Sequence, residues 1–346
     1  MFYIHHTTCI SPQQTFPNVD IAVLHPPIDG QLRVIEPPYT GIPSGVLRRM
    51  SRSVRMGVGA ALPLLNGVAA PDGIIIGTAN AGMEECFDFL KQIVEYNEGL
   101  LTPGNFVQST PNAIAAQLGM LSGNKGYNIT HVHLGLAFEN AVTDASMLIQ
   151  QYPENSYLLG AVDDISSYNY TLNLLAGWYK NAHTKAQNFY DTNSPGSIAG
   201  EGVAMFMVNG NAANALAQVK AFCSSHTTEA NAVEEQLKNF LNKNLAEGEK
   251  IDVLLSGENG DNRLSKFYTA CEELIPEEAL VLRFKHLCGE YPTASAVALW
   301  LACYVLQNKP LPAHIIKKNF TVGQFKNLLI YNCYKGVQHS FMLVKA

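Results

Sequence analysis

Short apolar runs alternate along this chain with longer, alanine-rich segments of helical character. This alternation constrains the fold more than any other feature, because it is typical of a β-sheet that is covered by helices on its faces. The predicted strands are Ile21–Leu24, Gly73–Gly77, Ile129–Leu134, Tyr157–Val162, Val203–Val208, Val253–Ser256, Leu280–Arg283, Asn327–Tyr331 and Ser340–Val344. The predicted helices are Gly45–Leu65, Gly82–Tyr96, Thr110–Leu121, Leu136–Gln150, Ala212–Cys223, Ala230–Lys243, Asn262–Leu274 and Thr293–Gln307. The sequence therefore predicts an α/β protein.

The low charge content indicates a thick body. Only 15% of the 346 residues are charged, against about 25% in typical domains, so we expect several stacked layers and surface buried in an oligomer. The abundant apolar core excludes disorder. A net charge of −6 without any basic run disfavours nucleic-acid binding. We find neither an apolar segment of membrane-spanning length nor a signal-peptide pattern, and the seven scattered cysteines indicate reduced thiols. These features predict a cytoplasmic protein that binds neither membrane nor nucleic acid.

Two helices, Leu136–Gln150 and Thr293–Gln307, are apolar or small over most of their surface. Such helices usually lie between two sheets, since a surface helix has a broad polar face. The most polar stretch, Ser224–Lys250, is the best candidate for a boundary, so we expect one half at residues 1–223 and a second at residues 224–346.

The short local motifs do not indicate a known chemistry. Gly77-Thr-Ala-Asn-Ala-Gly82 lacks the lysine and hydroxyl of a phosphate-binding loop. His131 and His133 could face one side of a strand, but no third metal ligand is evident, so we expect no metal site. No Gly-x-Ser-x-Gly nucleophile turn occurs.

The order of several sequence blocks resembles the β-ketoacyl synthases, the condensing enzymes of fatty-acid and polyketide assembly. The matching blocks, which span residues 45–345, are Gly45-Val-Leu-Arg-Arg-Met50, Thr102-Pro-Gly-Asn-Phe106, Pro111-Asn-Ala113, Gly200-Glu-Gly-Val-Ala204, Lys285-His-Leu-Cys-Gly-Glu290 with Thr293-Ala-Ser295, and the closing hairpin with Gly336. The resemblance implies a thiolase-like fold of five α-β-α-β-α layers, built from two pseudo-symmetric halves, and it implies no cofactor. It also implies that the two apolar helices form the middle layer.

The residues that carry out condensation in that family are replaced here. A ketosynthase uses a cysteine at a helix N-terminus as nucleophile, and two histidines for decarboxylation and oxyanion stabilisation. The resemblance places Gly135 at the cysteine position, with Ser256 and Glu290 at the histidine positions. The family's lysine is retained as Lys285.

The family's glycine-rich closing loop is altered as well. It keeps one glycine, Gly336, while Tyr334 and Val337 stand at two other glycine positions. Cys333, Tyr334 and Gly336 are therefore candidates for the lining of a vestigial pocket. Cys333 is not at the helix N-terminus and does not replace the nucleophile.

The resemblance implies a protein that is inactive in condensation alone, similar to the chain-length factors and to proteins of aryl-polyene and flexirubin-type pigment pathways. Such a protein forms a heterodimer with an active ketosynthase and meets acyl carrier protein through that partner. Two alternatives remain open: a diverged thioester-binding decarboxylase or hydrolase that uses Glu290 and Ser256, or a homodimeric scaffold. The resemblance places the dimer contact on the strand before the nucleophile helix, which comprises Asn128, Ile129, Thr130, His131, Val132, His133 and Leu134.

Overall fold

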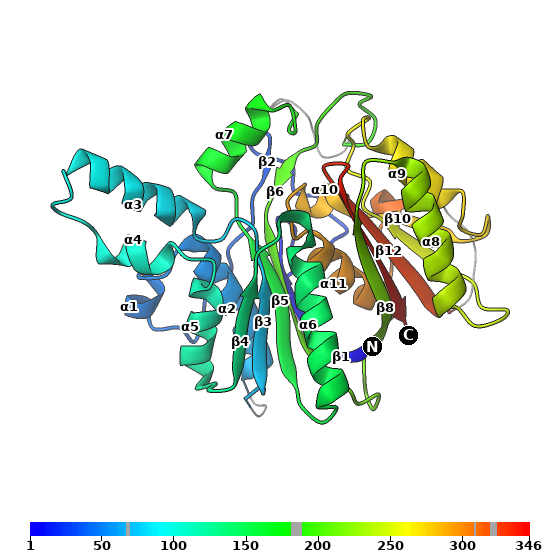
Figure 1. Cartoon of the computed structure of the whole chain (residues 1–346), viewed down its shortest axis with the longest axis horizontal. Helices are drawn as coiled ribbons and strands as arrows, with labels where there is room; N and C mark the ends of the chain where they lie inside the picture. The colour runs from blue at the N-terminus through cyan, green and yellow to red at the C-terminus, as the bar shows by residue number, and fades with distance from the viewer. Residues whose placement is uncertain (67–69, 181–188, 308, 319–323) are drawn as a thin grey trace.

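The computed structural model describes residues 1–66, 70–180, 189–307, 309–318 and 324–346 (Figure 1). Its strands form an eleven-stranded sheet in the order β11-β10-β9-β12-β13-β8-β1-β7-β5-β3-β4. The strands of the first half are β1 (Phe2–Ile10), β3 (Gly73–Gly77), β4 (Tyr127–His131), β5 (Tyr157–Asp163) and β7 (Gly202–Asn209). Those of the second half are β8 (Ala217–His226), β9 (Val253–Ser256), β10 (Leu280–Arg283), β11 (Ile316–Lys318), β12 (Asn327–Tyr334) and β13 (Gln338–Lys345).

The two halves repeat one topology. In the first half β4, β3 and β5 are parallel, and β7 and β1 follow antiparallel. In the second half β10, β9 and β12 are parallel, and β13 and β8 follow antiparallel. The expected pseudo-symmetry is thus present, and β8 is the counterpart of β1. The expected division after residue 223 falls inside β8, whereas the repeat of strand order makes β8 the first strand of the second half.

The two expected sheets are joined where β1 pairs with β8. This junction involves only Phe2, Tyr3 and Ile4 of β1. A separate two-stranded sheet is formed by β2 (Gln31–Leu32) and β6 (Ala199–Gly200).

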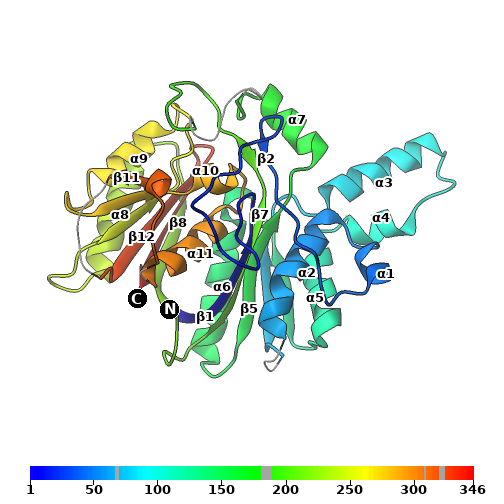
Figure 2. The same cartoon turned by 180° about the vertical axis from the view of Figure 1, so that it is seen from behind.

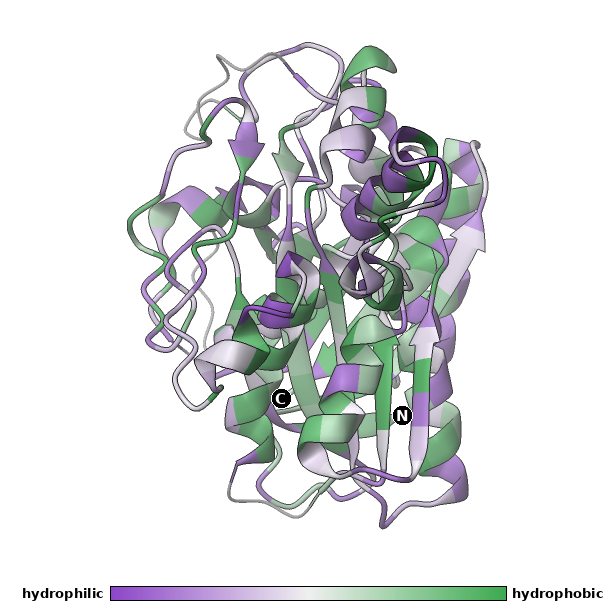
Figure 3. Cartoon of the chain, turned by 90° about the vertical axis from the view of Figure 1, so that its left-hand side faces the viewer, coloured by the Kyte–Doolittle hydropathy of each residue, from purple (hydrophilic) through white to green (hydrophobic). Residues whose placement is uncertain are grey.

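The sheet halves are buried on both faces, which produces the five layers. In β3, Ile75 faces the central core, whereas Ile74 and Ile76 face an outer core shared with the first-half helices. In β9, Leu255 faces the central core and Leu254 faces the other outer core. Strands buried on both faces form continuous apolar runs, and Figure 3 shows apolar residues along the strands in the interior.

The helices occupy three layers. The first outer layer contains α2 (Arg52–Leu65) and α5 (Ala113–Ser122), the central layer contains α6 (Ala137–Gln151) and α11 (Ser295–Leu306), and the second outer layer contains α8 (Ala230–Asn244) and α9 (Ser265–Glu272). Figure 2 shows α11 between the two halves. Shorter or peripheral helices are α1 (Ser44–Leu47), α3 (Met83–Glu95), α4 (Pro103–Gln108), α7 (Ser167–Leu175) and α10 (Lys285–Cys288). Of these, α3 and α4 form an arm that projects from the body (Figure 1).

The two central helices differ in burial. Every residue of α11 except Tyr304 is buried, as expected for a middle-layer helix. The same expectation is only partly right for α6, because Thr143, Met147 and Gln150 are exposed. This exposed strip exists because α6 packs beside β4, and β4 ends the sheet.

Two predicted elements are wrong, one strand was not predicted, and one predicted strand has different bounds. Residues 212–223 are predicted as a helix, but most of this segment belongs to β8, because pairing with β13 overrides the helix propensity of its alanines. Ile21–Leu24 is not a strand, although Ile21 is buried in the central core. β1 was missed because His5, His6 and two threonines make it look polar. The strand predicted to reach Leu134 ends at His131.

No helix within the described part of the chain is long and apolar enough to cross a membrane.

Candidate functional site

Gly135 lies in a 3-10 turn, Leu134–Leu136, between β4 and α6. Its backbone N–H is buried and donates a hydrogen bond to Oε1 of Gln338 at 2.8 Å. In a ketosynthase the residue at the corresponding position carries the nucleophile. Its backbone N–H is a candidate hydrogen-bond donor to the oxyanion that develops during the reaction. In this chain the backbone N–H of Gly135 already donates to the Gln338 side chain, so it is not free for a substrate oxygen.

The space beside Gly135 is filled by Tyr334. A Cβ atom built on Gly135 would lie 2.3 Å from Cβ of Tyr334 and 2.5 Å from its Cγ. Real Cβ atoms do not approach other carbon atoms so closely, so a cysteine at this position and Tyr334 in its observed place exclude one another. Burial, with smaller contributions from Tyr179 and from the Glu290 carboxylate, raises the pKa of the Tyr334 hydroxyl well above its ordinary value. Tyr334 is therefore a neutral ring that fills the space beside Gly135.

Glu290 is part of a buried ion pair. Nζ of Lys285 donates to Oε1 of Glu290 at 2.8 Å, and Nδ2 of Asn259 donates to Oε2 at 2.6 Å. The Lys285 side chain is 0% exposed and that of Glu290 is 8% exposed. Both carboxylate oxygens of Glu290 are thus engaged, which leaves it poorly placed to accept a proton from a substrate.

Ser256 ends β9 and is buried, between Tyr331 of β12 and Arg283 of β10 in the strand ladder. Its Oγ accepts a hydrogen bond from the backbone N–H of Glu258 at 3.3 Å. The Ser256 hydroxyl therefore bonds within its own loop.

The sequence-predicted positions are linked through β12 and the loop after β9. Tyr334, at the end of β12, contacts Gly135 and is near enough to Glu290 to respond to its charge. Asn259, three residues after Ser256, contacts Glu290. The structure thus brings Gly135 together with Tyr334, and Lys285 together with Glu290, while Ser256 joins this group only through its strand and loop.

The other two pocket candidates, Cys333 and Gly336, have structural roles in the closing hairpin. Burial raises the pKa of the Cys333 thiol to about 12, so the reactive thiolate is scarce. Gly336 forms the hairpin turn at φ +69°, directly after Lys335 at φ +53°. Positive φ favours glycine, which explains why this one glycine of the closing loop is needed.

The two histidines beside the site have hydrogen-bond partners. Nε2 of His131 lies 2.9 Å from Oδ2 of Asp144, and Nδ1 of His133 lies 3.0 Å from Nδ2 of Asn140. Both partners come from α6, so these rings link α6 to the segment that includes β4.

Gln338 is a site residue that the sequence analysis missed. It pairs directly with Tyr334 across the β12–β13 hairpin. The register of a hairpin is set by its turn, so recognising the turn at Lys335 and Gly336 would have placed Gln338 opposite Tyr334.

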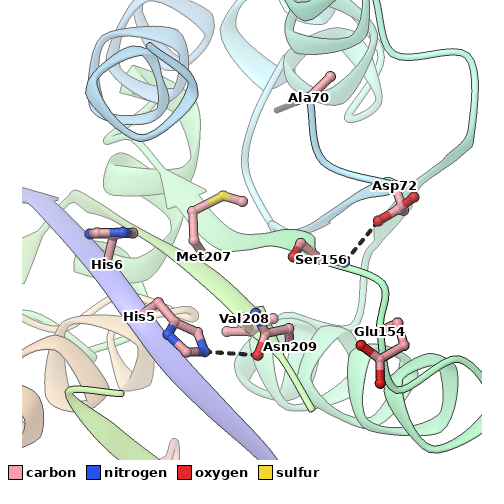
Figure 4. A pocket seen from close by; sticks show the side chains of 9 residues that line it. All are labelled: His5, His6, Ala70, Asp72, Glu154, Ser156, Met207, Val208 and Asn209. Carbon is pink, nitrogen blue, oxygen red and sulfur yellow. Dashed lines mark hydrogen bonds between the residues drawn. The ribbon is translucent and has the colours of Figure 1, made fainter. Parts of the chain in front are cut away.

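A surface hollow lined by His5, His6, Asp72, Glu154 and Asn209, among others, lies elsewhere (Figure 4). Nε2 of His5 is 2.7 Å from Oδ1 of Asn209. Asp72 and Ser156 immediately precede β3 and β5, whereas Gly135 follows the end of the parallel strand β4. The hollow is therefore at the opposite end of the parallel strands and is separate from the site.

Comparison with solved structures identifies the fold. A β-ketoacyl synthase from Burkholderia phymatum is similar at a TM-score of 0.78, with 12% identity over 99% of this chain and 98% of that one. A ketosynthase in complex with its chain length factor, ApeO with ApeC from Xenorhabdus doucetiae, gives a TM-score of 0.79, with 13% identity over 100% and 98%. The ishigamide ketosynthase/chain length factor gives 0.78, with 16% identity over 99% of each chain. No protein-family model matches the chain, and no curated protein is similar to it in sequence. The chain has the thiolase-like fold of these ketosynthases.

Proposed function

We propose that this chain is a non-catalytic, chain-length-factor-type partner of an active ketosynthase in fatty-acid or polyketide biosynthesis, of the aryl-polyene type. The observation that carries the proposal is the packing of Tyr334 on Gly135, because it fills the space that a nucleophile side chain would need at the position that the resemblance assigns to the cysteine. A glycine cannot hold an acyl chain covalently.

The remaining machinery of condensation is replaced too. Ser256 cannot provide an imidazole, and Glu290 is neutralised by Lys285. The alternative of a decarboxylase or hydrolase requires a carboxylate that is free to act as a general base. The engagement of both Glu290 oxygens, and the neutral ring of Tyr334 beside Gly135, count against that alternative.

The edge strand β4 supports a partner of the same fold. It ends the sheet order, and β3 is its one neighbour among the described strands. An open edge presents unpaired backbone donors and acceptors, which proteins normally cover or pair. The predicted dimer segment, residues 128–134, contains most of this edge, and the strand of a second ketosynthase-like subunit would extend the sheet across it. The similar structures described as ketosynthase/chain length factor complexes support this assembly.

We propose that acyl carrier protein is met through the catalytic partner, where the growing chain is bound. A structure similar to this chain at a TM-score of 0.71 and 15% identity is described as an acyl-carrier protein in complex with its ketosynthase. The role of the present chain is then to complete the acyl tunnel and limit product length, in the cytoplasm.

Co-expression with any ketosynthase that is encoded beside this chain tests the proposal. We expect an untagged ketosynthase to co-purify with the tagged chain in equal amounts, and condensation activity to require both. Incubation of the chain alone with malonyl-carrier protein should leave the thioester intact by mass spectrometry. A chain that remains a homodimer in the presence of the ketosynthase would favour the scaffold, and one that decarboxylates or hydrolyses the thioester would favour the diverged enzyme.

A further inference from the structure

Leu134, the residue before the vestigial nucleophile position, has an unusual backbone conformation. Its φ is +47°, in the left-handed region. Of the six non-glycine residues with positive φ in the described structure, the other five are Asp29, Asn97, Glu98, Asn214 and Lys335, so Leu134 is the one apolar residue. A leucine is disfavoured there because its Cβ is crowded by the backbone, and such strain persists only when surrounding contacts impose it.

The contacts that impose this conformation come from the closing hairpin. Oε1 of Gln338 accepts the N–H of Gly135 at 2.8 Å, and Nε2 of Gln338 lies 3.5 Å from the carbonyl oxygen of His133. One amide group therefore holds the backbone on both sides of Leu134. Tyr334, which faces Gln338 across the hairpin, packs against Gly135 and prevents it from moving away.

The Leu134 side chain is directed out of the core. It is 57% exposed, and Val132 is 54% exposed two residues earlier. Met147 of α6 is 65% exposed and lies one turn from Asp144, whose carboxylate accepts hydrogen bonds from Tyr127 and approaches His131 of β4. Val132 and Leu134 therefore continue the open edge of β4, which ends at His131, with exposed apolar side chains.

We propose that Leu134 is an anchor of the interface with the ketosynthase subunit, and that Gln338 and Tyr334 are positioning residues that fix it for that contact. This inference rests on the proposed function. The site that holds a nucleophile in a ketosynthase here sets the conformation of a partner-binding segment.

The combination of strain and exposure supports this assignment. A strained backbone and an exposed leucine both lower the stability of the isolated folded chain. The stability of that chain therefore explains neither feature. Both are explained if a partner buries the side chain, since apolar anchors at the centre of an interface provide much of its affinity. The partner that buries Leu134 is a chain of the same fold, because the neighbouring open edge of β4 requires a strand with which to pair.

The test compares Leu134→Asn with Val23→Asn. Asparagine tolerates the left-handed conformation, so Leu134→Asn relieves the strain and removes the apolar side chain together. Val23 is a matched control, because it is 66% exposed and lies two residues from Ile21, which accepts a hydrogen bond from His314 near the opposite edge of the sheet. Urea unfolding of the isolated chain and titration of the ketosynthase subunit are measured for both variants.

We expect opposite effects from Leu134→Asn in the two measurements. The unfolding midpoint should be unchanged or higher than in the wild type, and the dissociation constant for the ketosynthase should rise at least tenfold, equivalent to about 1.4 kcal/mol. Val23→Asn should change the dissociation constant less than twofold. Unaltered ketosynthase binding by Leu134→Asn, or a lower unfolding midpoint, would overturn the inference while the proposed function stands. A wild-type chain that binds no ketosynthase would overturn both.

Gln338→Leu tests the positioning role. This variant retains the size of the side chain but cannot bond to His133 or Gly135. It should weaken ketosynthase binding in the wild-type background, and should have little further effect in the Leu134→Asn background, because coupled residues are not additive. Equal losses of binding in both backgrounds would show that Gln338 acts independently of Leu134, and would overturn its positioning role.

Discussion

The buried pair of Lys285 and Glu290 predicts a large and asymmetric effect of mutation. At an effective dielectric constant of about 20, two unit charges 2.8 Å apart attract by about 6 kcal/mol. The burial cost of both ions offsets much of this attraction. Glu290→Gln removes the attraction but leaves the ammonium group of Lys285 buried without a counter-charge. We therefore expect the free energy of unfolding to fall by about 3–5 kcal/mol, a large part of the about 5–15 kcal/mol of a typical protein.

Urea denaturation followed by circular dichroism measures this effect, with the denaturant slope compared between variants. The double variant Lys285→Met/Glu290→Met removes both charges, and we expect it to be within about 2 kcal/mol of the wild type. Glu234→Gln is the control, because Glu234 pairs with Lys238 at 2.5 Å on an exposed helix face and such pairs contribute less than about 1 kcal/mol.

The reasoning is refuted if Glu290→Gln costs no more than Glu234→Gln. It is refuted as well if the double variant is as unstable as the single one, since the loss would then reflect shape and not an uncompensated charge.

Three further predictions follow from the same region and from the buried acids. Gly135→Cys should lower the melting temperature by several degrees because its Cβ meets Tyr334, and Gly135→Cys/Tyr334→Gly should recover part of the loss; a fully stable single variant would contradict the geometry. Burial, followed by Glu201 and Glu85, raises the pKa of Asp164 to about 8, so the folded state retains a proton that the unfolded state releases above about pH 4. Stability should therefore fall between pH 4 and 8, by on the order of 5 kcal/mol, and a pH titration of Asp164→Asn should show a flatter profile. Iodoacetamide should label Cys86, which is partly exposed, before Cys333, whose pKa is raised to about 12; peptide mass spectrometry that finds Cys333 labelled first in the folded chain would contradict its burial.

The strands of the core could be predicted because their pattern is local. β3 and β9 match the predicted Gly73–Gly77 and Val253–Ser256 because strands buried on both faces are continuous apolar runs between turn residues. β8 could not be read in this way, since its alanines are neutral in a strand and only its neighbours β1 and β13 decide its conformation.

Only part of the site could be predicted from the sequence, because some of its contacts join residues that are far apart along the chain. The glycine at the position that the resemblance assigns to the nucleophile is visible in the sequence as Gly135, and Lys285 lies only five residues from Glu290. Tyr334 and Gln338 lie about 200 residues after Gly135, so their contacts depend on how the two halves pack. Local sequence showed an altered loop, but the close contact between Tyr334 and Gly135 could be seen only in the folded chain.

The contact between Gly135 and Tyr334 also couples the residue types that these two positions can hold. With Tyr334 in place, a side chain at position 135 collides with it; with a cysteine in place, the ring must move out of a buried site. Filling a cavity adds packing, while creating one costs stability. Tyr334→Gly alone would therefore leave a void beside Gly135 and release the restraint on Leu134. A cysteine at position 135 therefore requires a change at Tyr334 as well, and that change would remove packing from the segment that includes Leu134.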